Sequence, residues 1–322
     1  VKTGFIGDND GGNQKFTIFV ILTRKDYGSE NIQSQRVGVD NGAYYGLPFT
    51  PEEAALVLVS APWDVTVSYG AGTALAPDAL IEASTQLDLY DASAPGAWLG
   101  GIATADIDYS LQEESRKLRA DAERVIEHLE EGGAPDDERI ERRLRRINEG
   151  CAAMNDNIYR QARQWLSQGK VVGLVGGDHS TPYGLIRAVA EKEGSLGILH
   201  IDAHCDLREA YEGFEFSHAS IMFNVLRDLP QVSKLVQVAC GIIAMPRPKG
   251  PLRTGGSLCS IRARSLAPDS RERPGPKAAA ASWTSCPRWF ISVSTSTDSP
   301  SNIVLIRALP FRAASLLNRW FT

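Results

Sequence analysis

Two apolar stretches, separated by a helical one, mark the centre of the chain. Residues 170–175 read Lys-Val-Val-Gly-Leu-Val, and residues 196–201 read Leu-Gly-Ile-Leu-His-Ile. Between them, residues 182–192 have the composition and length of a helix. Strands that are apolar on both faces and joined through a helix are typical of a parallel sheet covered by helices. A similar apolar run predicts an earlier buried strand over residues 54–60.

Capping residues and helical spacing predict three further helices. Pro77 is well placed as the first residue of a helix that runs through residue 83. Glu, Arg, Leu and Ala recur with helical spacing over residues 110–131, and a Gly-Gly-Ala-Pro sequence follows. Asp136 or Asp137 is the expected N-cap of a second long helix that continues to about Ser167. The charged pairs three or four residues apart on these helices indicate a solvated face.

The two ends of the chain do not share this organisation. Residues 1–36 are polar and weakly patterned, and we interpret them as an N-terminal arm. Residues 241–322 carry 12 Lys and Arg against 3 Asp and Glu, a net charge of about +9, whereas the rest of the chain carries about −14. This segment also holds 9 of the 17 prolines and shows little periodicity, which is typical of poorly ordered chain. We therefore predict one domain over residues 37–322, with an aberrant segment at 241–322.

Composition narrows the class of protein. The 322 residues are 43% hydrophobic and 23% charged, as in ordinary globular proteins. A net charge of −5 gives no reason to expect a nucleic-acid partner. The apolar run at residues 16–22 is too short to cross a bilayer, so we expect no membrane association. Five widely spaced cysteines without a Cys-x-x-Cys fit reduced thiols, and we expect a cytoplasmic protein.

Metal-binding residue types follow the two central strands. Residues 176–180 read Gly-Gly-Asp-His-Ser, and residues 202–206 read Asp-Ala-His-Cys-Asp. Ligands bind at the carboxyl ends of parallel strands, and imidazole with carboxylate suits Mn²⁺ and related ions. Asp202 has two oxygens with which to bridge two ions, and an extended segment would point His204 and Asp206 to the same side. With His179, these residues predict a centre of more than one ion that activates water.

The remaining histidines have more than one interpretation. His218 is a candidate proton shuttle or substrate ligand near the metals, or a buried structural residue. His200 lies within the apolar stretch 196–201, and we interpret it as a core residue. His128 lies on a charged helix and is expected to face solvent.

These motifs resemble those of the ureohydrolase family, which includes arginase and agmatinase. The Gly-Gly-Asp-His-Ser and Asp-Ala-His-Cys-Asp sequences carry the resemblance. Shorter matches support it at residues 62–66, 70–73, 147–150 and 211–218. The similarity covers about residues 37–240 and is greatest to the agmatinase-like branch. It implies a three-layer α/β/α arginase-like fold with a central parallel sheet, and a binuclear Mn²⁺ (manganese) site for which Ni²⁺ is the alternative.

The resemblance also implies roles for individual residues. His179 and Asp206 would hold one ion, His204 the other, and Asp202 would bridge them, while Asp178 would brace the motif. His218 and Asp206 are the implied catalytic residues. The implied reaction is hydrolysis of a small guanidino substrate, agmatine above others, to urea and an amine by a metal-bridging hydroxide. The resemblance further implies a homo-oligomer and a place in polyamine metabolism, with guanidine or a guanidino acid as alternative substrates.

The C-terminal segment departs from the family. A third family motif, Asp-x-Asp-x-x-Asp-Pro, supplies two more metal ligands, but Ser294 and Ser296 stand at those positions. Ala313 stands where a substrate-binding glutamate is expected. Under one choice of codons, residues 294–299 read in a shifted frame give Asp-Ile-Asp-Gly-Leu. We hypothesise that parts of residues 241–322 are translated in the wrong frame, and an ordinary divergent tail is the alternative.

Loss of these ligands changes the functional expectation. We predict weak or single-ion loading and impaired catalysis for the chain as written. A catalytically impaired metal-binding or oligomer-partner protein is the alternative of another class. A metal-dependent deacetylase on a similar fold is a weaker alternative, because the two central motifs favour the ureohydrolases.

Overall fold

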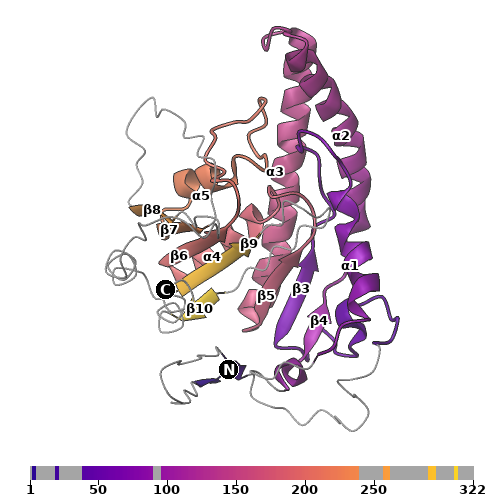
Figure 1. Cartoon of the computed structure of the whole chain (residues 1–322), viewed down its shortest axis with the longest axis vertical. Helices are drawn as coiled ribbons and strands as arrows, with labels where there is room; N and C mark the ends of the chain where they lie inside the picture. Colours follow the sequence, from indigo (N-terminus) through magenta and orange to yellow (C-terminus); the bar gives the residue numbers. More distant parts are fainter. Residues whose placement is uncertain are drawn as a thin grey trace, which may run out of the picture.

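Strands and helices alternate along the central part of the chain in the computed structural model (Figure 1). The structure describes residues 2–4, 19–21, 38–89, 96–238, 257–261, 289–294 and 308–310. The helices are α1 (Ala76–Ser84), α2 (Tyr109–Glu130), α3 (Glu138–Ser167), α4 (Tyr183–Glu193) and α5 (Ile221–Asp228), with single turns of 3-10 helix η2 (Tyr44–Gly46), η3 (Thr73–Leu75) and η4 (Ala97–Gly100). The strands are β1 (Lys2–Gly4), β2 (Phe19–Ile21), β3 (Leu56–Ser60), β4 (Ile102–Thr104), β5 (Val171–Val175), β6 (Leu196–Ile201), β7 (Val232–Val238), β8 (Ser257–Ile261), β9 (Trp289–Ser294) and β10 (Ala308–Pro310).

The central strands form two sheets that are mainly parallel. In the smaller sheet, β3 lies between β4 and β5 and runs parallel to both. In the larger sheet, the order is β10-β9-β6-β7-β8, and only β10 is antiparallel to its neighbour. The parallel strands confirm the predicted α/β fold, although these central strands fall into two sheets and not one.

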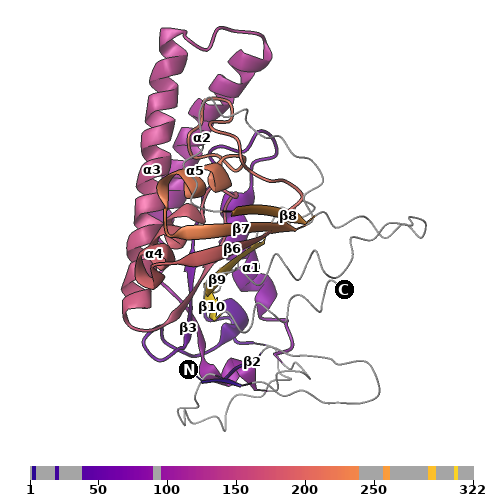
Figure 2. The same cartoon turned by 90° about the vertical axis from the view of Figure 1, so that its left-hand side faces the viewer.

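Helices cover both faces of the smaller sheet, which makes three layers. Val57 and Val59 of β3 belong to the main core, together with buried residues of α2, α3 and α4. Leu58 points to the opposite face, where it clusters with Tyr44 and Val175, and Ile81 of α1 packs against this cluster. Because side chains alternate along a strand, β3 is buried on both sides, as its apolar sequence predicts. Figure 2 shows α3 and α4 along one side of the strands.

Side-chain caps explain where the two long helices begin. Asp137 is the N-cap of α3 and accepts a hydrogen bond from the backbone of Arg139. This helix ends at Ser167, as predicted from the sequence. Asp108 caps α2 in the same way, through the backbone of Ser110. The sequence analysis did not predict β4, α5 or β7.

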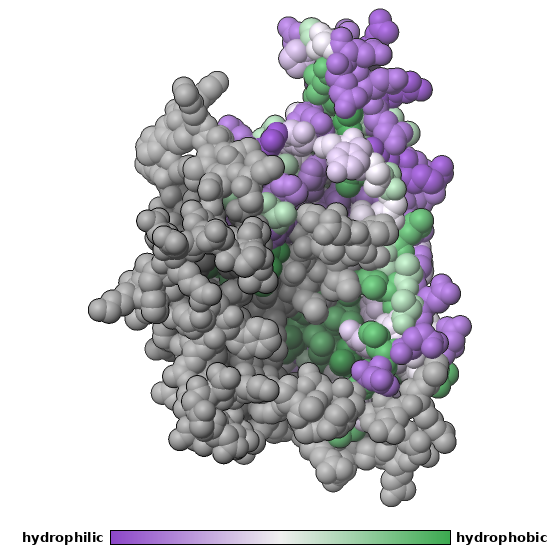
Figure 3. Space-filling model, in the orientation of Figure 1, coloured by the Kyte–Doolittle hydropathy of each residue, from purple (hydrophilic) through white to green (hydrophobic). Residues whose placement is uncertain are grey.

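The long helices α2 and α3 extend beyond the sheets as a paired projection (Figure 1). Asp121 of α2 forms ion pairs with Arg143 and Arg146 of α3, which ties the two helices together. Their outer surface is mostly hydrophilic in Figure 3. Within the part of the chain that the structure describes, no helix is long and apolar enough to cross a membrane.

The two end segments are described only in part. In the predicted N-terminal arm, β1 and β2 pair in antiparallel register. In residues 241–322, the described parts are β8, β9 and β10. Most of the predicted tail, with Ser296 and Ala313, lies outside the described residues. The proposed domain limits and the order of the tail therefore stay predictions.

Candidate metal centre

The first metal motif, as we call residues 176–180, leaves β5 through a turn that requires glycine. Gly177 has a φ of +58°, a conformation that favours glycine. A Cβ atom at this residue would lie 2.5 Å from the carbonyl oxygen of Trp63 and 2.7 Å from that of Ala61. The turn therefore packs tightly against the chain that follows β3. It places Asp178 and His179, both buried, directly after the end of β5.

The second metal motif, residues 202–206, follows β6 and turns back sharply. Asp202 comes directly after Ile201, the last residue of β6. Asp206 has a φ of +49°, so the segment is not extended at this residue. Asp206 is almost buried, whereas the side chain of His204 is 58% exposed. The expectation that His204 and Asp206 point to one side of an extended segment is therefore wrong.

Four buried side chains converge where these two motifs meet. One ligand atom from each of His179, His200, Asp202 and Asp206 lies within 4.8 Å of all the others. Nδ1 of His179 lies 2.6 Å from Oδ2 of Asp206 and 3.5 Å from Oδ2 of Asp202. Nε2 of His200 lies 3.6 Å from the same oxygen of Asp202 and 3.9 Å from Oδ2 of Asp206. Two buried carboxylates so close together need a positive charge to compensate them.

Burial and charge act in opposite directions on the two imidazoles. Burial disfavours a charged His179, but the hydrogen bond and charge of Asp206, with the charge of Asp202, raise its pKa overall. For His200, burial outweighs the carboxylates and lowers the pKa. Nε2 of His179 and Nε2 of His200 are buried without a hydrogen-bond partner. Unsatisfied buried nitrogens are costly, so both rings are candidates for a further polar partner.

His204 lies on the outer side of the same cluster. Its Nδ1 is 3.4 Å from Oδ1 of Asp202, and its backbone N–H donates to that oxygen at 2.7 Å. The carboxylate of Asp202 thus turns Oδ2 toward His179 and His200, and Oδ1 toward His204. The structure therefore brings His179, Asp202 and Asp206 together and leaves His204 next to them at the surface.

The sequence analysis missed the place of His200 in this cluster. His200 was interpreted as a core residue, and it is fully buried. However, it lies two residues before Asp202, and side chains at i and i+2 of a strand share a face. That spacing was the signal that could have placed it at the site.

His218 is connected to the first metal motif by contacts with Thr66. Nδ1 of His218 is 3.1 Å from the carbonyl oxygen of Thr66. A carbonyl can only accept, so Nδ1 carries the proton and Nε2 of the neutral ring is left as an acceptor. The hydroxyl of Thr66 is 3.4 Å from Oδ2 of Asp178, which links this region to the first motif. Burial raises the pKa of Asp178, whose Oδ1 accepts from the backbone of Ser180, so Asp178 braces its turn.

The loop before His218 is held by helix α3. The side-chain amide of Asn148 donates to the carbonyl of Gly213 and accepts from the backbone N–H of Glu215. The ring of Tyr211 contacts that of His218 edge-on, with 5.9 Å between the centroids. These contacts fix the loop relative to the core, and they give a structural role to Asn148.

The described part of the C-terminal segment reaches the same edge of the larger sheet. Strand β9 runs parallel to β6, and Ser294 pairs with Ile201, the residue before Asp202. The backbone at residue 294 is therefore next to the metal motif, where the resemblance places a carboxylate ligand.

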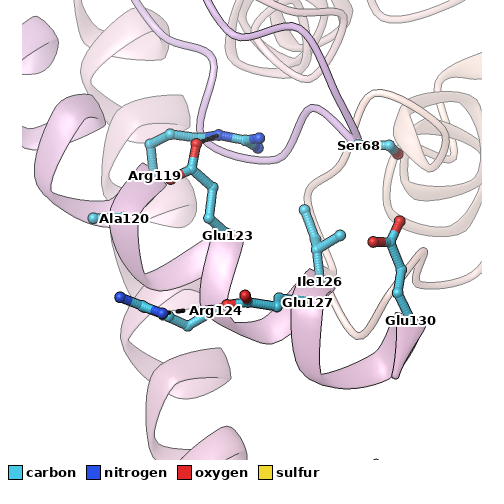
Figure 4. Close-up of a pocket in the computed structure, with 8 residues that line it drawn as sticks. All are labelled: Ser68, Arg119, Ala120, Glu123, Arg124, Ile126, Glu127 and Glu130. Carbon is cyan, nitrogen blue, oxygen red and sulfur yellow. Dashed lines mark hydrogen bonds and ion pairs between the residues drawn. The ribbon is translucent and has the colours of Figure 1, made fainter. Parts of the chain in front are cut away.

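A surface hollow on helix α2 has different chemistry. It has a volume of about 420 Å³ and lies beside the chain that follows β3 (Figure 4). Glutamates and arginines of α2 make most of its wall, and Arg119 donates to the carbonyls of Val65 and Val67. The hollow contains none of the clustered ligands, and we do not assign it a role. It is lined by Ser68, Arg119, Ala120, Glu123, Arg124, Ile126, Glu127 and Glu130.

Comparison with known proteins gives consistent results. The model of the arginase family matches residues 54–244. N(1)-aminopropylagmatine ureohydrolase of Thermus thermophilus is 29% identical over 218 residues, which cover 63% of this chain and 56% of that protein. Agmatinase of Bacillus anthracis is 28% identical over 170 residues, covering 52% and 46% respectively. The chain thus spans about half the length of the curated relatives it matches.

Solved structures support the fold. The crystal structure of agmatine ureohydrolase of Thermoplasma volcanium aligns with a TM-score of 0.53 and covers 82% of this chain and 72% of that one. At 19% sequence identity, this likeness shows the fold alone. It confirms the predicted arginase-like α/β architecture.

Proposed function

Because this chain belongs to the arginase family, we propose that it is a metal-dependent ureohydrolase which converts a small guanidino compound to urea and an amine. Agmatine is the proposed substrate, since relatives that match over half of the chain are named for agmatine or its aminopropyl derivative. Guanidine and guanidino acids are the alternatives. Mn²⁺ is the proposed metal, because mixed imidazole and carboxylate ligands suit it. A homo-oligomer and a cytoplasmic location remain part of this proposal.

The buried cluster fits one divalent ion. His179, Asp202 and Asp206 offer one imidazole and two carboxylates within a few ångströms of one another. Nδ1 of His179 and the buried carboxylates of Asp202 and Asp206 converge on one place, and a divalent cation there would be stabilised by all three. For a second ion, the described residues offer His204 and the outer oxygen of Asp202. This donor set is poor, and it supports the proposal of weak or single-ion loading.

Individual residues would then divide the work. A divalent ion bound here supplies positive charge that lowers the pKa of a water molecule toward neutrality. Asp206 would hold the ion and keep the imidazole of His179 in place through their close contact. His218 presents Nε2 as a proton acceptor, because its Nδ1 is held by the carbonyl of Thr66. The convergence of His179, Asp202 and Asp206 in one buried cluster is the observation that carries this proposal.

Urea release is the direct test. The Mn²⁺-loaded chain is offered agmatine, arginine and guanidine in turn, and we expect slow urea release that is fastest with agmatine. Asp202→Ala should abolish this activity because it removes a carboxylate from the cluster. His128→Ala is the matched control, since His128 is on α2 and contacts the carbonyl of Ala134. Equal rates for Asp202→Ala and the unmodified chain would contradict the proposal.

A non-catalytic metal-binding protein is the second candidate. The identity of residue 294 favours it, because the resemblance expects a charged carboxylate ligand at this position and the sequence has a neutral serine. Tight Mn²⁺ binding with no urea from any of the three substrates would support this candidate. Activity with one of them would exclude it.

A further inference from the structure

Gln237 lies against His200 in the middle of the larger sheet. The two residues are paired in register between β7 and β6. Both side chains are fully buried. Because Gln237 is on a strand beyond the two metal motifs, its sequence position alone does not connect it with the site.

The orientation of the Gln237 amide is set by a backbone carbonyl. Its Nε2 lies 2.7 Å from the carbonyl oxygen of Cys205, within the second metal motif. A carbonyl oxygen only accepts, so the atom facing it must be the NH₂ group. This removes the usual ambiguity between the oxygen and nitrogen of a side-chain amide. The second hydrogen of the same NH₂ is directed at Nδ1 of His200, 2.9 Å away.

This contact determines where His200 carries its proton. Nδ1 receives a hydrogen from Gln237 and must therefore be the acceptor, so the proton of the neutral ring is on Nε2. Nε2 faces Oδ2 of Asp202 at 3.6 Å and Oδ2 of Asp206 at 3.9 Å. These distances exceed a hydrogen bond, and Nε2 has no other partner. His200 thus presents a buried N–H donor to both carboxylates.

We propose that Gln237 and His200 are positioning residues that hold an N–H donor against Asp202 and Asp206 and strengthen the metal site without contacting the ion. This inference rests on the metal site of the proposed function. The N–H is 3.6 Å from Oδ2 of Asp202, just beyond hydrogen-bond distance, so it orients this carboxylate electrostatically. Loss of a group that orients a metal ligand typically costs about 10–100-fold in metal affinity or activity. The lone pair of His200 is engaged by Gln237, so His200 is a donor to the carboxylates and not a fourth ligand.

The tautomer of His200 is the first test, and it needs no metal. Two-bond ¹H–¹⁵N correlation spectra of the metal-free chain, labelled with ¹⁵N-histidine, distinguish Nε2–H from Nδ1–H rings. We expect His200, assigned by its loss in His200→Gln, to be the Nε2–H form. In Gln237→Met, which keeps the size but removes the donor, we expect this preference to weaken. An Nδ1–H ring in the unmodified chain would overturn the inference.

Metal affinity is the second test. Calorimetric titration with Mn²⁺ should show binding weakened about 10–100-fold by Gln237→Met and by His200→Leu, with unchanged stoichiometry. His200→Gln, which retains an N–H donor, should recover part of the loss. Ser233→Ala on the same strand is the control. Ser233 donates to the carbonyl of Leu196, which is the first residue of β6 and lies at the end of the β6–β7 pair away from Asp202. Circular dichroism shows whether each variant is folded.

The outcomes separate the two proposals. Unchanged affinity in folded Gln237→Met, with strong binding by the unmodified chain, overturns the positioning role and leaves the metal site intact. Mn²⁺ affinity in folded His200→Gln as low as in His200→Leu would show that the retained N–H donor has no effect, which also overturns it. No Mn²⁺ binding by the unmodified chain would overturn the proposed function, while the spectra would still decide the contact between Gln237 and His200.

Discussion

A single carboxylate, that of Asp202, lies between two different environments. Its Oδ2 faces the buried nitrogens of His179 and His200, from which water is largely excluded. Its Oδ1 faces His204, whose side chain is more than half exposed. Electrostatic interactions are stronger where water is excluded. An ion on the inner side of Asp202 is therefore attracted more strongly to this carboxylate than an ion on the outer side. This asymmetry within one residue favours the inner position for metal binding.

The asymmetry predicts unequal effects of two histidine substitutions. His179→Ala removes a proposed ligand and should weaken Mn²⁺ binding by at least about 100-fold, because loss of a group that only supports a ligand already costs up to about 100-fold. His204→Ala should weaken it by less than about tenfold, because the proposed inner ligands remain. Isothermal titration calorimetry measures both, with His128→Ala as the control. A larger effect from His204→Ala would show that the exposed side of Asp202 holds the stronger site.

Among the elements, α2 depends on one cap that also joins it to α3. Asp108 accepts from the backbone and hydroxyl of Ser110 at the N-terminus of α2. Its second oxygen accepts from the side chain of Asn157, on α3, at 2.9 Å. The hydroxyl of Ser110 is the main reason that the pKa of Asp108 is lowered. A charged cap thus fixes the beginning of α2 against its neighbour.

We predict that Asp108→Ala lowers the free energy of unfolding by about 1 kcal/mol at pH 7, the usual cost of losing an N-cap. Because folding lowers this pKa, the stabilisation is complete above the ordinary aspartate value of about 3.9 and is lost as the pH falls through the folded value. Urea denaturation of the metal-free chain from pH 7 to about pH 2.5 measures the difference, which should stay constant down to about pH 4 and shrink below it. Asp106→Ala is the control, since Asp106 is exposed and caps no helix. A difference that grows toward low pH would contradict the assignment.

At the scale of the whole molecule, the C-terminal segment decides how complete the site is. β9 brings residue 294 to the carboxyl end of β6, next to the metal motif. The residue at that position is serine, and the charge of residues 241–322 is opposite to that of the rest of the chain. We propose, as one account of both facts, that this segment is partly translated in the wrong frame. Sequencing the coding DNA for residues 240–322 would decide between this account and a divergent tail.

Restoring the two carboxylates should complete the site. We predict that Ser294→Asp combined with Ser296→Asp raises the Mn²⁺ stoichiometry from one ion to two per chain, because each aspartate supplies a charged ligand in place of a neutral hydroxyl. Titration calorimetry and metal analysis measure the change. The control adds two aspartates at Ser299 and Ser301, which changes the net charge equally. One ion in both variants would mean that the serines are not what limits loading.

The sequence by itself was sufficient for the local features. Apolar runs and capping residues predicted β3, β5, β6 and the limits of α3, because such features depend on neighbours within a few residues. The two motifs predicted that His179, Asp202 and Asp206 would gather after two strand ends, and they do, although β5 and β6 lie in different sheets and are not the neighbours that were expected. Short strand β4 and helix α5 were missed, since their sequences are too brief to show a period.

Only the tertiary structure decided the environment of each side chain. Asp206 has a positive φ and lies in the buried cluster, whereas the side chain of His204 is exposed, and no spacing rule could show this difference. His200 and Gln237 are brought together by the pairing of β6 with β7, across 37 positions of sequence. The carbonyl of Cys205 then fixes the amide of Gln237, and through it the proton of His200. The sequence determines which hydrogen-bonding side chains are available. The direction in which each of them donates its hydrogen depends on contacts between distant parts of the chain.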